Sequence, residues 1–261
     1  MESDAGLSNL CLVRALALGP GYRFLVEVHV IVAPVFATNC CLVVAGHGEP
    51  GAHMVIVDAG GGVADTVMQV VEERGWLPQA VLATHGHADH VWDARTLCER
   101  YDIPLRIHAD DAYRLSDPLG TLDAEKCEGH GPVATAMEQG LVACGYRLDD
   151  YQLPPQVIPF DASGDDGQGT LLAGDISLGV VHAPGHTQGA VLYVTDELAL
   201  TGDVLFAGTV GRTDLPGGDP KAMRESLQLV RRVLDVSLGV VPGHGPTTTL
   251  KREMESNPYF Q

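Results

Sequence analysis

Short apolar runs bounded by turn-forming residues occupy much of the first third of the chain. Runs of this length and composition predict strands, here over residues 10–18, 24–32, 41–45, 54–57 and 80–83. Within the second run, Glu27 and His29 alternate with apolar residues and therefore share one face of the strand. We expect His29 to be an exposed strand residue and not a metal ligand.

Apolar residues also recur at the spacing of a helix in three segments. Between residues 63 and 74 four valines fall on one side, and a similar pattern follows at 91–100. A third pattern over 220–234 begins with Pro220, which suits a first helical turn, and Asp219 precedes it as an expected cap. These segments predict three helices.

The second half of the chain repeats the order of the first. Strands are expected from about 157 to 200, then the helix 220–234, then a strand over 238–241. Two sheet-plus-helix halves packed sheet to sheet give an α/β fold of four layers, an αβ/βα sandwich. We expect one such domain over residues 1–261.

Residues 116–155 depart from this scheme because they are interrupted by prolines and glycines. We predict an irregular insertion there, with one short helix near Val133 to Cys144. Long loops in compact domains are often functional, so the insertion either covers a site or only decorates the surface.

The charge and the cysteines of the chain indicate which classes of partner and which cellular compartment to expect. The chain has 34 acidic and 16 basic residues, a formal net charge of −18, which argues against a nucleic-acid partner. Its six cysteines form no C-x-x-C pair, which favours reduced thiols. The acidic start lacks the positive charge of a signal peptide, and the run 10–18 is too short to span a membrane. We therefore expect a cytoplasmic protein without a membrane segment.

Potential metal ligands concentrate in the turn from the strand 80–83 into the helical pattern 91–100. This turn contains His85, His87, Asp89 and His90 within six residues. Imidazole and carboxylate are ligand types that suit zinc and iron. The alternative is a set of solvated loop residues, which explains poorly why four potential ligands directly follow an apolar strand.

Three more candidates, His186, Asp203 and His244, each follow a strand-like run and stand beside a glycine. Glycine allows close approach of the backbone. The order strand, turn, ligand therefore occurs four times, and the sequence predicts that the later three residues complete the site begun by the first turn.

With its H-x-H-x-D-H motif at residues 85–90, the sequence resembles the metallo-β-lactamase-fold hydrolases over roughly 30–258. Within them it is most similar to the glyoxalase II group of thioester hydrolases. The segments that narrow the resemblance are Pro184–Thr187, Thr201–Asp203 and Gly211–Asp214. The persulfide dioxygenase branch shares these segments, so they do not determine the substrate.

The resemblance implies a site for two divalent metal ions, zinc by preference, with iron or manganese as alternatives. One ion would be held by His85, His87 and His186, and the other by Asp89, His90 and His244. Asp203 would bridge them, and Asp58 would support the ligand loops from behind. A hydroxide between the ions would attack a thioester carbonyl, with Asp89 as the catalytic residue that orients it.

Arg212 supplies positive charge where the glyoxalase II group contacts glutathione, so the resemblance implies a substrate-binding role for it. The alternative is a structural ion pair with Asp214 or Asp219.

Three functions stay open at this point. The expected partner is a small-molecule substrate, with no nucleic acid and no membrane. The first is a metal-dependent thioester hydrolase, with lactonase or β-lactamase activity as a variant. The second is a persulfide dioxygenase with one Fe(II) on His85, His186 and Asp203, a two-histidine, one-carboxylate set. The third is a non-catalytic metal-binding or interaction protein on the same scaffold. Nothing in the sequence indicates the oligomeric state.

Overall fold

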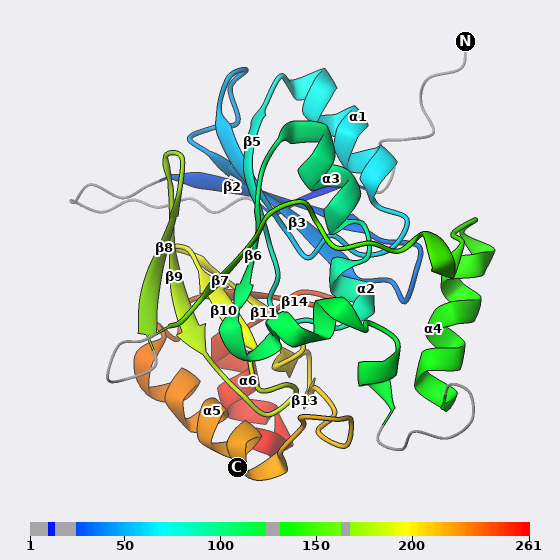
Figure 1. Ribbon diagram of the computed structural model, residues 1–261. Helices are drawn as coiled ribbons and strands as arrows, with labels where there is room; N and C mark the ends of the chain where they lie inside the picture. The colour runs from blue at the N-terminus through cyan, green and yellow to red at the C-terminus, as the bar shows by residue number, and fades with distance from the viewer. Residues whose placement is uncertain (1–9, 14–24, 124–130, 163–167) are drawn as a thin grey trace.

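Two β-sheets face each other, and helices cover the outer face of each (Figure 1). The structure, a computed structural model, describes residues 10–13, 25–123, 131–162 and 168–261. Of the strand expected over 10–18, the part at Leu10–Val13 is present and the rest lies outside the described residues.

The first sheet contains seven strands in sequence order and is antiparallel up to its fourth strand, then parallel. The helix α1 (Ala64–Arg74) connects β4 to β5, and α2 (Ala88–Val91) and α3 (Ala94–Tyr101) connect β5 to β6. The strands are β1 Leu10–Val13, β2 Val26–Val32, β3 Asn39–Ala45, β4 His53–Val57, β5 Leu77–Leu82, β6 Leu105–His108 and β7 Val157–Phe160.

The second sheet has the order β15-β14-β11-β10-β9-β8, with β11 and β14 parallel and the other neighbours antiparallel. The helices α5 (Pro220–Val233) and α6 (Leu250–Ser256) belong to this half, as does a small ribbon of β12 (Leu205–Phe206) and β13 (Thr209–Val210). The strands are β8 Gln168–Ala173, β9 Ile176–His182, β10 Val191–Val194, β11 Leu198–Gly202, β14 Gly239–Pro242 and β15 Thr248–Thr249.

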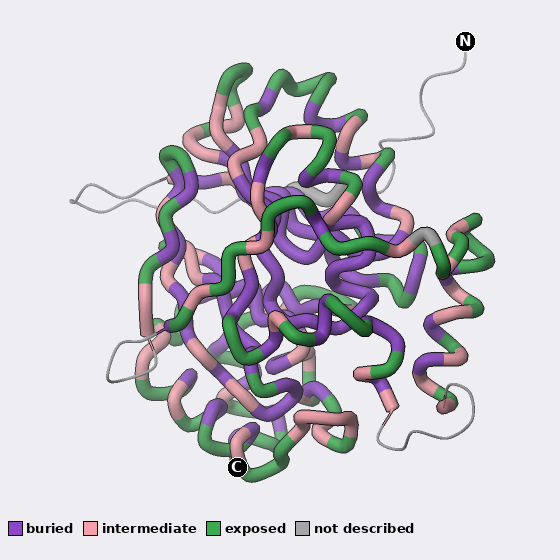
Figure 2. Tube along the Cα trace, viewed as in Figure 1, coloured by how far each residue is buried: buried purple, intermediate pink, exposed green. Residues whose placement is uncertain are grey.

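Three apolar clusters separate the layers. In Figure 2 the buried residues are concentrated in the interior of the molecule, where the sheets lie. In β3, Cys41 and Val43 face the second sheet, whereas Cys40, Leu42 and Val44 pack toward α1 and α3. This alternation follows from the two-residue period of a strand. The second sheet packs its other face against α5 and α6. The layers therefore confirm the predicted αβ/βα sandwich.

Some elements differ from the sequence prediction. The helix expected over 91–100 is divided between α2 and α3, and α6 has no counterpart among the predicted helices. The prediction of an exposed His29 is wrong, because its side chain is 4% exposed and its ring lies 5.0 Å from the Trp76 ring. The Trp76 indole covers the face of β2 that carries His29, a face that the strand period alone assigns to solvent.

The insertion contains the expected helix, α4 (Pro132–Ala143), between short 3-10 turns at Gly120–Leu122 and Leu148–Asp150. A further 3-10 segment, Ala109–Ser116, precedes it, and Pro258–Phe260 forms another near the chain end. The α4 residues Ala134, Met137 and Leu141 pack in one cluster with Val35 and Trp92. The insertion is thus anchored on the segment after α2. The assignment of residues 1–261 to one domain stays a prediction.

None of the described helices provides an apolar stretch long enough to cross a bilayer.

Candidate metal centre

The seven predicted ligands all follow the carboxyl ends of strands. The turn with His85 leaves β5 and enters α2, whereas the other segments leave β9, β11 and β14. Because β11 and β14 are neighbours and parallel, Asp203 and His244 emerge at the same edge of the second sheet. The structure brings all seven side chains together at this edge.

One group consists of three imidazoles in mutual contact. Nδ1 of His87 lies 3.0 Å from Nε2 of His85 and 2.9 Å from Nε2 of His186. Ligand nitrogens of a tetrahedral zinc at about 2.0–2.1 Å are separated by roughly 3.3 Å. These two separations are close to what a single small cation requires, and ligand atoms of the three residues all lie within 4.8 Å of one another.

The second group contains two imidazoles and a carboxylate. Nε2 of His244 lies 3.2 Å from Nε2 of His90 and 3.2 Å from Oδ2 of Asp89. Asp203 stands between the groups: its Oδ1 is 3.4 Å from His90, and its Oδ2 is 3.6 Å from His186 and 3.5 Å from His244. A carboxylate in this position can serve two cations at once.

Partners outside the cluster orient the histidines. Nδ1 of His186 donates to the carbonyl oxygen of Arg212 at 2.8 Å, and Nδ1 of His244 donates to that of Phe36 at 3.0 Å. A carbonyl oxygen only accepts hydrogen bonds, so both rings carry their proton on Nδ1. Their Nε2 lone pairs consequently face the cluster, as metal ligation needs.

Asp58 orients two further histidines from a left-handed turn at the end of β4, where its φ is 60°. Its Oδ2 accepts from Nδ1 of His90 at 2.9 Å and from the Thr84 hydroxyl at 2.8 Å. Because that hydroxyl donates to Asp58, its oxygen is available to accept from Nδ1 of His85, 3.2 Å away. Asp58 thus lies behind the ligands, as the resemblance implied.

Replacing Asp58 with asparagine is expected to weaken metal binding by about 10- to 100-fold, the usual effect of losing such a partner. The amide keeps one acceptor oxygen where the carboxylate had two. Either His90 and the Thr84 hydroxyl lose the oxygen that they share, or the Thr84 N–H loses its acceptor. A titration against a chelator measures the affinity. Asp65→Asn, an exposed residue of α1, is the matched control. Equal affinities for the two variants would contradict the orienting role.

The donor set fits metal ions. Imidazole and carboxylate ligands suit zinc, iron and manganese, and among the described residues the buried Oδ1 of Asp203 has no hydrogen-bond partner. Burial, with help from His90, lowers the pKa of His85 well below its usual value. Burial opposes ionisation of Asp203, but His90, His186 and His244 outweigh it and hold its pKa below the usual range. Neutral imidazole and ionised carboxylate are the ligating forms.

Asp111, which sequence reasoning missed, joins two ligand loops. Its Oδ2 accepts from Gly86 N at 2.8 Å and from the Thr187 hydroxyl at 2.7 Å, and its Oδ1 accepts from Gly189 N at 2.9 Å. The fully buried Arg114 pairs with it at 3.2 Å. Asp111 therefore spaces the loop of His85 and His87 from the loop of His186. Nothing in the sequence distinguished it from the neighbouring Asp110.

Arg212 lies at the edge of the site with its side chain 49% exposed. Its Nε and Nη2 donate to Asp214 at 2.7 and 2.6 Å, the ion pair that the sequence left as the alternative interpretation. Its backbone carbonyl, which orients His186, is the part of the residue in direct contact with a ligand.

A cavity of about 200 Å³ opens beside the ligands. Its polar lining consists of His87, Asp89, His186, Asp203, Arg212 and His244.

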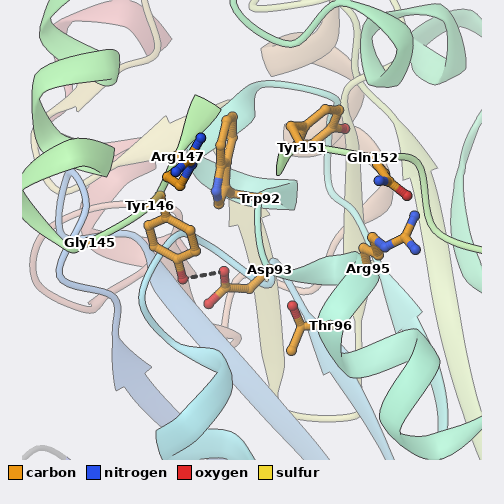
Figure 3. Close-up of a pocket in the computed structure, with 9 residues that line it drawn as sticks. All are labelled: Trp92, Asp93, Arg95, Thr96, Gly145, Tyr146, Arg147, Tyr151 and Gln152. Atoms are coloured by element: carbon orange, nitrogen blue, oxygen red, sulfur yellow. Dashed lines mark hydrogen bonds between the residues drawn. The ribbon is translucent and has the colours of Figure 1, made fainter. Parts of the chain in front are cut away.

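A second cavity of about 280 Å³ lies at the junction of the insertion and the start of α3 (Figure 3). There the Tyr146 hydroxyl donates to Asp93 at 2.5 Å, and the other oxygen of Asp93 accepts from the first N–H groups of α1.

Comparison with known proteins gives consistent matches. Residues 33–244 match the family model described as the metallo-beta-lactamase superfamily. An uncharacterised protein of Mycobacterium tuberculosis strain H37Rv is 33% identical over 88% of this chain and 95% of its own. The hydroxyacylglutathione hydrolase GloC of Haemophilus influenzae is 28% identical over 90% of this chain and 98% of its own. The crystal structure of TTHA1623 in a di-iron-bound form superposes with a TM-score of 0.61 at 29% identity, covering 95% of this chain and 100% of that one.

Proposed function

Because the chain belongs to the metallo-β-lactamase superfamily, we propose that it is a metal-dependent hydrolase that cleaves a thioester such as a hydroxyacylglutathione. The observation that carries the proposal is the pair of oriented ligand groups that share Asp203. The similarity to GloC supports the thioester class. The second ligand group, which one Fe(II) would not need, favours a hydrolase over the dioxygenase.

One divalent ion would be held by His85, His87 and His186. The other would be held by Asp89, His90 and His244, and Asp203 would contact both ions. Zinc suits these ligands, and the di-iron form of TTHA1623 supports iron as the alternative to zinc. When bound, two such ions polarise a carbonyl group and lower the pKa of a shared water molecule toward neutrality.

The protein's own groups position the reactants. Burial disfavours the ionised form of Asp89, but His90 and His244 outweigh it and lower its pKa, so the residue is a carboxylate that can accept a hydrogen bond from the attacking water. The thiolate leaves without a strong general acid, which matches the absence of lysine from the described cavity lining. In this proposal Nη1 of Arg212, which Asp214 does not engage, contacts the thiol carrier.

The test measures thiol release and oxygen uptake on one preparation. S-Lactoylglutathione is expected to yield free thiol in the absence of oxygen, whereas glutathione persulfide with Fe(II) should cause no oxygen uptake. The same sample stripped of metal is the control and should release no thiol. Rapid oxygen uptake with persulfide, and no thiol from any thioester, would replace the hydrolase with the dioxygenase.

We also place the protein in the cytoplasm as part of this proposal. Cys40, Cys41, Cys98 and Cys144 are free thiols. Burial, and to a lesser extent Glu99, raises the pKa of Cys98 to about 12, so it is a poor nucleophile. Unpaired cysteines of this kind suit a reducing compartment.

A further inference from the structure

The cavity beside the metal centre has one wall of carboxylate and imidazole groups and another wall that is apolar. The apolar wall consists of Phe36, Leu122, Val133, Met137 and Leu215. The carbonyl group under attack must lie at the polar wall, next to the ligands. The group that extends from it toward the other wall therefore meets only hydrocarbon among the described lining residues.

Three of the five apolar residues come from the insertion: Leu122 from a 3-10 turn, and Val133 and Met137 from α4. Met137 is 1% exposed and packs with Val35, Ala88 and Trp92, and Val133 is half-buried against the same cluster. Their side chains thus connect the core of the insertion to the cavity.

The insertion is fixed to the segment that directly follows the ligand His90. The Trp92 ring lies 4.9 Å from that of Tyr151 and 6.1 Å from that of Tyr146. All three side chains are drawn in Figure 3. Hydrogen bonds from Tyr146 to Asp93 and from Tyr151 to the Leu115 carbonyl at 2.9 Å hold both tyrosines. The apolar wall consequently has a defined position relative to the metal ligands.

The chemistry of the two walls indicates which part of a substrate enters. A peptide-like thiol carrier has amide and charged groups, and an apolar wall offers these groups no hydrogen-bond partner. Such a carrier suits the edge of the site, where the Arg212 side chain is 49% exposed. The apolar wall is then left to the acyl group.

We propose that this cavity selects substrates with an apolar acyl group, and that Val133 and Met137 determine this preference. The inference rests on the proposed thioester hydrolysis and specifies its substrate class. Burial of each methylene contributes about a fourfold gain in transition-state binding when complete.

The test uses S-acetyl, S-butanoyl and S-hexanoyl N-acetylcysteamine, which share one leaving group. We expect kcat/KM to rise about tenfold or more from acetyl to hexanoyl. This value assumes that the acyl group is only partly buried. Met137→Gln and Val133→Thr, each close in size to the original side chain, should abolish most of this rise. Val142→Thr, on the same helix but 55% exposed, is the matched control and should keep it. Circular dichroism checks that the variants are folded.

A second measurement does not depend on turnover. Titration calorimetry of metal-loaded protein with acetate, butanoate and hexanoate should show tighter binding of the longer acids, and less so in Met137→Gln. Turnover with no preference for chain length would overturn the inference while the hydrolase proposal stands. If no thioester is cleaved, the proposed function fails, and hexanoate binding no tighter than acetate would then overturn the inference as well.

Discussion

Replacing Asp203 with alanine is expected to remove one of two bound metal ions and to lower kcat by about a hundredfold or more, since two-metal chemistry requires both ions. The carboxylate approaches His90 through one oxygen and His186 and His244 through the other. No other described carboxylate contacts histidines of both ligand groups in this way. Without Asp203, the two ligand groups no longer share a carboxylate.

Elemental analysis of wild type and variant, each reconstituted with zinc, measures the ion count beside the turnover of a thioester. Wild type should contain close to two ions per chain and the variant close to one. Asp65→Ala, which removes an exposed carboxylate from α1, should change neither value. Full metal content with normal turnover in Asp203→Ala would remove this residue from the site.

Replacing Asp111 with alanine is expected to reduce the free energy of unfolding by about 3–5 kcal/mol, because it leaves the Arg114 guanidinium buried without its counter-ion. Both side chains are fully buried. The change also removes the acceptor of the Gly86 and Gly189 N–H groups. A buried donor without a partner adds its own desolvation cost.

Urea unfolding of metal-free protein measures this effect without a contribution from metal binding. The double variant Asp111→Ala with Arg114→Leu removes both charges and should regain part of the lost stability. Asp110→Ala, at the exposed neighbouring residue, should stay within about 0.5 kcal/mol of wild type. A stable single variant, or a double variant less stable than the single one, would contradict the ion-pair argument.

Sequence patterns alone predicted the layers and named the candidate ligands that the structure brings together. Strand and helix periods depend on neighbours a few residues apart, so apolar spacing was enough to locate α1 and α5. The four ligands of the first turn are likewise close in sequence, and a strand end followed by a helix start gives them a common direction. Asp219 caps α5 as expected, accepting from the N–H groups of Lys221 and Ala222.

The environment of these ligands was decided by tertiary contacts between distant residues. Phe36 orients His244 across 208 positions, and Arg114 reaches the Pro216 carbonyl across 102. Neither contact leaves a local pattern, because an orienting carbonyl can belong to any residue type. Asp111 could not be told from Asp110 in the sequence, because its role also depends on residues far away in the chain. Only the fold places its carboxylate between the two ligand loops. The same reason applies to Trp76, whose indole buried His29, since the position of a covering side chain depends on the packing of the whole first sheet.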